Sequence, residues 1–74
     1  MHLYDFEVLM DGAVVAAERA VALDDARAAW AEVERLARRN DQPGRKIRVK
    51  DESGRIVILT GVASVLRLAR DLAA

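Results

Sequence analysis

Two short turn signals, each lying between two apolar runs, constrain the fold of this chain more than any other feature. The first is Asp11-Gly12 and the second is Asp51-Glu52-Ser53-Gly54. Such signals predict hairpins, because Gly takes positive φ without steric cost and Asp tolerates it. The layout is then strand–turn–strand, helix, strand–turn–strand, helix, and it uses nearly all 74 residues. The sequence therefore predicts one domain, residues 1–74, with no separate lid or catalytic insert.

The first three strands are predicted from alternation and from residue type. Residues 2–10 place apolar side chains on one face and Asp5 and Glu7 on the other, the pattern of a strand with one buried face. Residues 13–22 are rich in Val and Ala and predict the second strand. Residues 47–50 alternate again and predict a half-exposed third strand.

One long helix is predicted between the hairpins. Asp24 or Asp25 is its N-cap, because either carboxylate can accept orphan backbone N–H groups. The helix ends before Pro43, near residue 41. Its apolar stripe predicts the core-facing side chains Ala26, Ala29, Trp30, Val33, Leu36 and Ala37.

The fourth strand and the last helix raise the question of what covers them. Residues 56–59 are apolar without alternation, and such a strand needs cover on both faces. The long helix supplies one cover, and the other must come from a short C-terminal helix, with its stripe over 62–72, or from a partner chain. The predicted fold is an α+β two-layer sandwich, two hairpins flanking a long helix (ββαββ) plus the short helix, on a mainly antiparallel four-stranded sheet.

The residue inventory supports no catalytic, metal or cofactor site. The chain has no Cys, which removes disulfides, thiolate ligands and Cys nucleophiles. His2 is the single His, too few for a zinc cluster, and it lies far in sequence from Ser53 and Ser64. The paired carboxylates are explained as cap and turn residues. We therefore expect a non-enzymatic cytoplasmic protein, without signal peptide or membrane span and without a cofactor.

Several segments resemble a family of short, uncharacterised bacterial proteins that opens Y-x-F-x-V, reaches a D-G turn, and closes I-x-V-x-D-E-x-G-R. The matching positions are Tyr4–Val8, Asp11-Gly12, Leu23–Arg27, Ile47, Val49, Asp51, Glu52, Gly54 and Arg55. The chain departs from that pattern at Ala20-Val21-Ala22 and at Gly61-Val62. The family is labelled a domain of unknown function, so the resemblance implies a fold and no activity.

The apolar surplus at the C-terminal end is the leading functional signal. Either one intramolecular core closes over it, or a second chain completes it, which suits a domain with so little chain to cover both sheet faces. The second interpretation predicts a self-associating, homodimeric interaction module, or one that binds another protein. Its candidate contact residues are Val57, Leu59, Val65, Leu68 and Leu72.

A basic stretch gives the alternative function. Residues 35–50 hold seven basic side chains and one acidic side chain, although the whole chain is neutral. A nucleic-acid-associated regulator or antitoxin-like protein would use these cations on phosphates. The plainer interpretation is a solvated helix end and strand face. The candidate contacts are Arg38, Arg39, Arg45, Lys46, Arg48 and Lys50.

Overall fold

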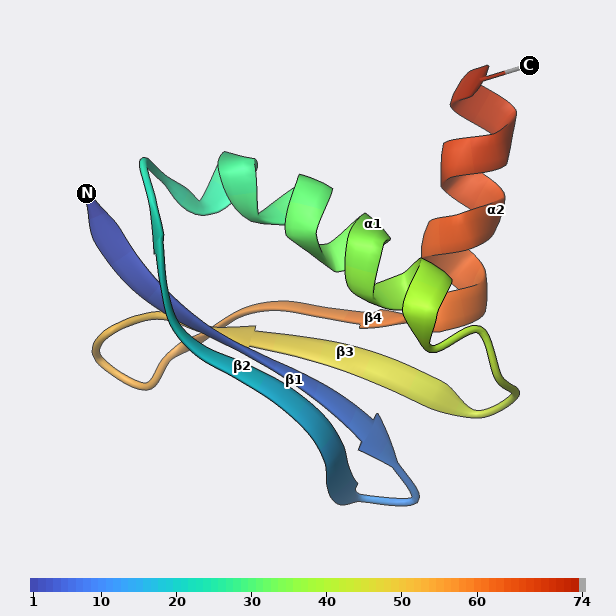
Figure 1. Ribbon diagram of the computed structural model, residues 1–74, viewed down its shortest axis with the longest axis horizontal. Coiled ribbons are helices and arrows are strands. Elements are labelled where there is room, and N and C mark those ends of the chain that lie inside the picture. The colour runs from blue at the N-terminus through green and yellow to red at the C-terminus, as the bar shows by residue number, and fades with distance from the viewer. Residues whose placement is uncertain (74) are drawn as a thin grey trace.

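The computed structural model describes residues 1–73 and has the predicted α+β architecture (Figure 1). Its elements follow the order β-β-α-β-β-α, with one 3₁₀ turn, η1, leading into the first helix. No helix in this range is long and apolar enough to cross a membrane. The elements are β1 (His2–Met10), β2 (Ala13–Leu23), η1 (Ala26–Ala28), α1 (Ala29–Arg39), β3 (Arg45–Lys50), β4 (Ile56–Gly61) and α2 (Val62–Ala73).

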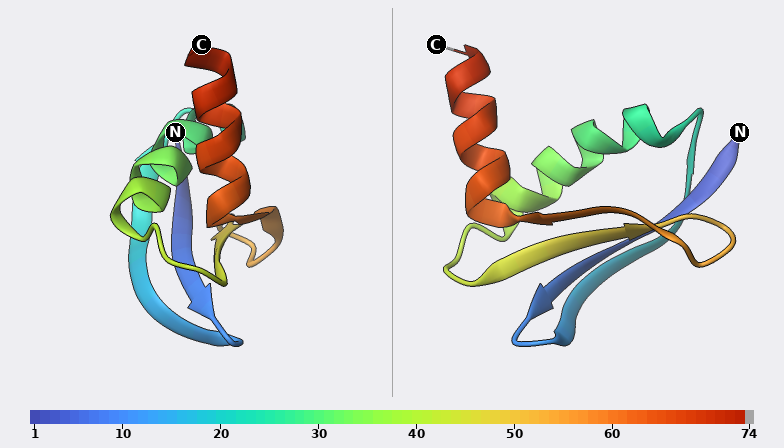
Figure 2. Two further views of the ribbon diagram at one scale, coloured as in Figure 1. Left: turned by 90° about the vertical axis from the view of Figure 1, so that its right-hand side faces the viewer. Right: turned by 180° about the vertical axis from the view of Figure 1, so that it is seen from behind.

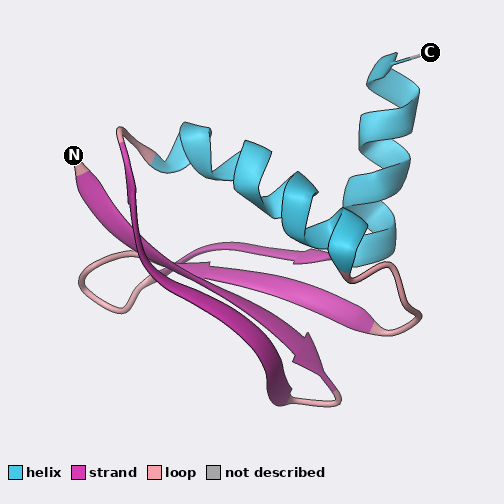
Figure 3. Ribbon diagram, viewed as in Figure 1, coloured by secondary structure: helices cyan, strands magenta, loops and turns pink. Residues whose placement is uncertain are grey.

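The four strands form one antiparallel sheet in the order β2-β1-β3-β4 (Figure 3). The sheet joins the two hairpins side by side, because β1 pairs with β3 from Asp5↔Lys50 to Met10↔Arg45. β1 and β3 are therefore the central strands, and β2 and β4 are the edges. This order could not be read from the sequence, since either strand of each hairpin could have been central.

Both turns have the predicted chemistry. Asp11 and Gly12 take φ values of 52° and 80°, and Gly54 takes 85°. In the second turn, the Asp51 carboxylate accepts hydrogen bonds from the Ser53 hydroxyl at 2.6 Å and from the backbone N–H groups of Ser53 and Arg55. These bonds, with that from the Ser53 hydroxyl foremost, hold the pKa of Asp51 below its ordinary value.

Both helices lie on the same side of the sheet (Figure 2). Of the two covers expected for the second face of strand 56–59, a C-terminal helix or a partner chain, the helix does not cover that face. The physical reason is that α2 begins directly after Gly61, at the end of β4, and turns toward α1. The opposite face of the sheet, called here the outer face, carries no helix within residues 1–73.

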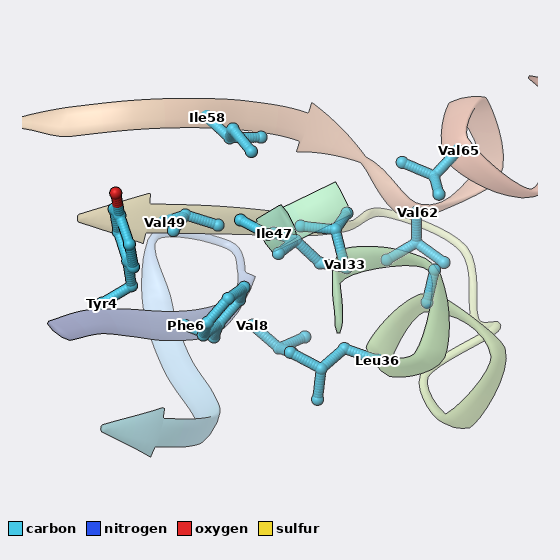
Figure 4. Packing of buried hydrophobic residues seen from close by; sticks show 12 residues of the cluster. Tyr4, Phe6, Val8, Val33, Leu36, Ile47, Val49, Ile58, Val62 and Val65 are labelled. Atoms are coloured by element: carbon cyan, nitrogen blue, oxygen red, sulfur yellow. The ribbon is translucent and has the colours of Figure 1, made fainter. Parts of the chain in front are cut away.

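The core lies between the sheet and the helices (Figure 4). The predicted β1 face is confirmed, since Tyr4, Phe6 and Val8 are buried. Only the beginning of α2, at Val62 and Val65, reaches this core. The fully enclosed large side chains are Phe6, Val8, Val33, Ile47, Val49 and Val62.

A bulge in β4 explains how a strand without alternation fits a sheet covered on one side. Val49 pairs with Ile58 and Lys50 with Ile56, so Val57 has no partner in the register. Ile58 is buried and Val57 is half-buried against the core. Ile56 remains exposed.

Of the two candidate N-cap residues, Asp25 is the one that caps the helix. Asp25 has extended backbone angles, and its carboxylate accepts the backbone N–H of Ala28 at 3.1 Å. Its neighbour Asp24 is exposed and makes no such bond. The helix then passes through η1 into α1 and ends at Arg39, close to the predicted end.

Replacing Asp25 by Ala is expected to lower the free energy of unfolding by about 1 kcal/mol, because it removes the side-chain hydrogen bond that caps the N-terminal end of η1 and α1. Asp24→Ala is the matched control, and we expect it to change stability by less than about 0.5 kcal/mol. Urea unfolding followed by circular dichroism measures both. Equal losses in the two variants would contradict the assignment of the cap to Asp25.

Candidate functional site

Within residues 1–73, a mainly apolar hollow lies in the angle between α1 and α2. Its volume is about 480 Å³, and we call it the helix groove. Trp30 is 48% exposed, Leu68 56% and Leu72 79%, although all three are large apolar side chains. The lining residues are Trp30 and Glu34 from α1 and Val65, Leu68, Ala69, Leu72 and Ala73 from α2.

The groove exists because α2 leaves the core soon after it begins. Its first residues pack at Val62 and Val65, and the later turns rise away from the sheet (Figures 1 and 2). Leu68 and Leu72 continue the stripe of Val65 at helical spacing, so they face the same side as the buried residue. That side meets no further chain within residues 1–73, which leaves the two leucines in solvent.

The prediction that Trp30 belongs to the core is wrong. The buried side chains of α1 are Ala29, Val33, Leu36 and Ala37, which face the sheet. Trp30 lies one residue, or about 100° of helix rotation, beyond Ala29 and therefore at the margin of the stripe. There it faces α2 rather than β1 and β3. The helical period alone cannot predict which neighbouring element a side chain at the margin of the stripe will face.

The structure brings together only part of the predicted self-association surface. Val65, Leu68 and Leu72 line the helix groove, with Val65 itself buried. Leu59 pairs with Arg48 and is 59% exposed on the outer face of the sheet. Val57 packs against the core. The five residues therefore lie on separate surfaces, not on one.

The outer face holds a buried carboxylate that sequence reasoning missed. The Glu7 side chain is only 5% exposed, because three cations from neighbouring strands cover it. Its Oε1 lies 2.8 Å from Arg48 Nη2 and 3.6 Å from Lys50 Nζ, and its Oε2 lies 3.1 Å from Arg19 Nη2. Alternation correctly placed Glu7 opposite the core, but it cannot say which cross-strand neighbours enclose a side chain.

Burial alone raises the pKa of Glu7, but hydrogen bonds from Arg48 and Arg19 and the positive charges of Arg48 and Lys50 outweigh it. The net effect holds this pKa below its ordinary value of 4.5. The carboxylate therefore stays charged throughout the neutral range. It binds β2, β1 and β3 together across the face that has no helix.

The predicted nucleic-acid contacts do not form one patch. Arg38 lies on α1, where Glu34 is its partner at 2.9 Å, and Arg45 donates to the Asn40 side chain at 2.8 Å. Arg48 and Lys50 surround Glu7 on the outer face. Arg39 and Lys46 are exposed, one on the helix and one on the sheet.

A polar hollow at the opposite end of the sheet contains His2 and Ser53, which are far apart in sequence. His2 Nδ1 lies 3.6 Å from Glu52 Oε1, and Glu52 also accepts the backbone N–H of Leu3 at 3.0 Å. The Ser53 hydroxyl donates to Asp51 instead of to His2. Within residues 1–73, no three His, Cys, Asp or Glu side chains are grouped to hold a metal ion.

Comparisons with known proteins do not add a function to this geometry. No protein-family model matches the chain, and searches of curated proteins and of solved structures give no significant match. The resemblance to the short bacterial family stays a prediction. The helix groove is the candidate functional site on the strength of its own geometry.

Glu7→Gln is expected to lower the free energy of unfolding near pH 7 by about 2 kcal/mol, because it leaves three cations facing a neutral amide. Since the folded pKa of Glu7 is depressed, its contribution is present above pH 4.5 and is lost as the pH falls through the folded pKa. The variant should therefore lose less stability than the wild type on acidification. Urea unfolding near pH 7 and near pH 3 measures both effects.

Glu52→Gln is the matched control, because the Glu52 carboxylate also contacts β1, at His2 and the Leu3 N–H, but is 54% exposed. We expect it to change stability by less than about 0.5 kcal/mol. Equal losses in the free energy of unfolding for the two variants would show that the enclosure of Glu7 adds nothing to the stability of the fold.

Proposed function

We propose that this chain is a small, non-enzymatic protein–protein interaction module that self-associates as a homodimer in the cytoplasm. The observation that carries the proposal is the helix groove, where Trp30, Leu68 and Leu72 expose apolar surface on one side of the molecule. Exposed apolar surface of this kind, gathered into one concave area, is typical of interaction sites in small domains. The absence of Cys from the chain agrees with a reducing compartment.

The total exposed area supports the proposal. The molecule exposes 4923 Å² at a mass of 8.2 kDa. A compact monomer of this mass exposes about 4500 Å². The excess agrees with a helix that stands away from the body, as α2 does in Figure 2. A second copy covering α2 would remove at least this excess.

The nucleic-acid alternative has weaker support. Four of the seven cations of the basic stretch already have acidic partners: Arg35 contacts Glu18 and Glu32, Arg38 contacts Glu34, and Arg48 and Lys50 contact Glu7. Paired cations release fewer counterions on binding a phosphate backbone. The structure also divides the stretch between the helix and the outer face, so it presents no continuous track.

Replacing both Leu68 and Leu72 by Gln is expected to weaken self-association at least about tenfold, because it removes the exposed apolar side chains of the groove. Leu59→Gln is the matched control, since Leu59 is as exposed as Leu68 but lies on the outer face. Sedimentation equilibrium of the full chain measures all three proteins.

Two results would contradict the proposal. A wild-type chain that stays monomeric at high micromolar concentration would show that it does not self-associate. A dimer weakened by Leu59→Gln and unaffected by the double variant would move the interface to the outer face.

A further inference from the structure

The exposed half of α2 carries two opposite charges beside its leucines. Arg67 precedes Leu68 by one residue, and Asp71 precedes Leu72 by one residue. Each charged side chain is therefore rotated about 100° from its leucine, and both lie on the same flank of the helix. Both are exposed, and neither forms an ion pair with any described residue.

The other flank of α2 faces the groove. Ala69 and Ala73 follow the two leucines by one residue, and both line the groove with Trp30. The exposed turns of α2 thus have three parallel strips: small residues toward Trp30, leucines in the middle, and charges on the far side. A helix packed on the leucine strip would meet apolar surface on one side and the charges on the other.

We propose that the partner in this groove is a second copy of the chain, with the two α2 helices packed antiparallel and crossing at Ala69. This inference rests on the proposed self-association and specifies its geometry. Ala69 lies midway between Arg67 and Asp71, so antiparallel helices that cross there place Arg67 of each copy opposite Asp71 of the other. A two-fold axis produces this pair twice.

The same arrangement covers the apolar surface. Leu68 and Leu72 of each copy enter the groove of the other, beside its Trp30. A parallel two-fold arrangement would instead place the charged flank of each helix beside the alanine flank of the other, and Arg67 and Asp71 would gain no partner between copies. Charge complementarity therefore selects both a second copy as the occupant and the antiparallel direction.

A standard interface would take only a part of the surface of this chain. A standard interface takes about 800 Å² from each partner, which is about one-sixth of the 4923 Å² surface of this chain. The groove residues Trp30, Leu68 and Leu72 lie within the part of the surface that this interface would cover.

Charge-reversing substitutions at Arg67 and Asp71 test the antiparallel geometry. Arg67→Asp makes both flank positions acidic, and Asp71→Arg makes both basic. Each single variant should form its homodimer roughly tenfold more weakly than the wild type at low salt, because two attractive pairs become two repulsive ones. An equimolar mixture of the two variants should form a heterodimer close to wild-type affinity, because every contact between copies is then attractive again.

The mixture separates contacts between copies from effects within one helix. Positions 67 and 71 are also neighbours four apart on their own helix, and the repulsion there persists in each variant after mixing. Rescue in the mixture therefore arises only between copies. Arg70→Asp is the control, since Arg70 lies toward Arg38 and Asp41 on a different side of α2. We expect it to leave the dimer affinity within about twofold of the wild type.

The experiment uses sedimentation equilibrium with circular dichroism as the check on folding, and each outcome is decisive. Weak homodimers and a restored heterodimer support the antiparallel pairing. Wild-type dimers that the single variants leave unchanged, or a mixture that stays as weak as its components, overturn the pairing while self-association stands. A monomeric wild type overturns both proposals. The double variant carrying both exchanges should dimerise like the wild type and confirms that charge reversal itself does not unfold α2.

Discussion

Apolar packing of α1 and the first turn of α2 against one face of the sheet is the interaction on which the rest of this structure depends. Ile47, Val33 and Val62 come from three different elements and meet in the core, each at most 1% exposed (Figure 4). Because one face receives both helices, the other receives none. The exposed later turns of α2, the helix groove and the charged outer face all follow from this asymmetry.

The two uncovered surfaces meet solvent in different ways. The outer face is stabilised by charge, since the Glu7 carboxylate is enclosed by Arg19, Arg48 and Lys50 from both neighbouring strands. It needs no further cover to keep its polar atoms satisfied. The helix groove has no such network, and its leucines and Trp30 gain nothing from water. Ile56 and Leu59 are also exposed, but they share their hollow with Lys46 and Arg48. The interaction is therefore assigned to the groove, where Trp30 and the leucines line a mainly apolar surface.

Local chemistry in the sequence was enough to predict the hairpins, the fold class and the cap region of the helix. Glycine and aspartate in turns, and alternation in β1 and β3, depend on neighbours along the chain. The failures concern contacts distant in sequence. Trp30 belongs to the helical stripe by period, yet only the position of α2 determines that it faces the groove. Glu7 looks like any solvent-facing strand residue until its cross-strand neighbours are known, and the side taken by α2 depends on the sheet order.

The central claim is that a second copy covers the groove around Trp30, which is the only Trp in the chain. Its fluorescence therefore reports on that surface alone. In a dilution series with acrylamide as quencher, we predict that Trp30 emission shifts to shorter wavelength and becomes harder to quench over the same concentrations at which sedimentation shows the mass doubling. If the mass doubles while emission and quenching stay constant, the copies meet elsewhere and the account is contradicted.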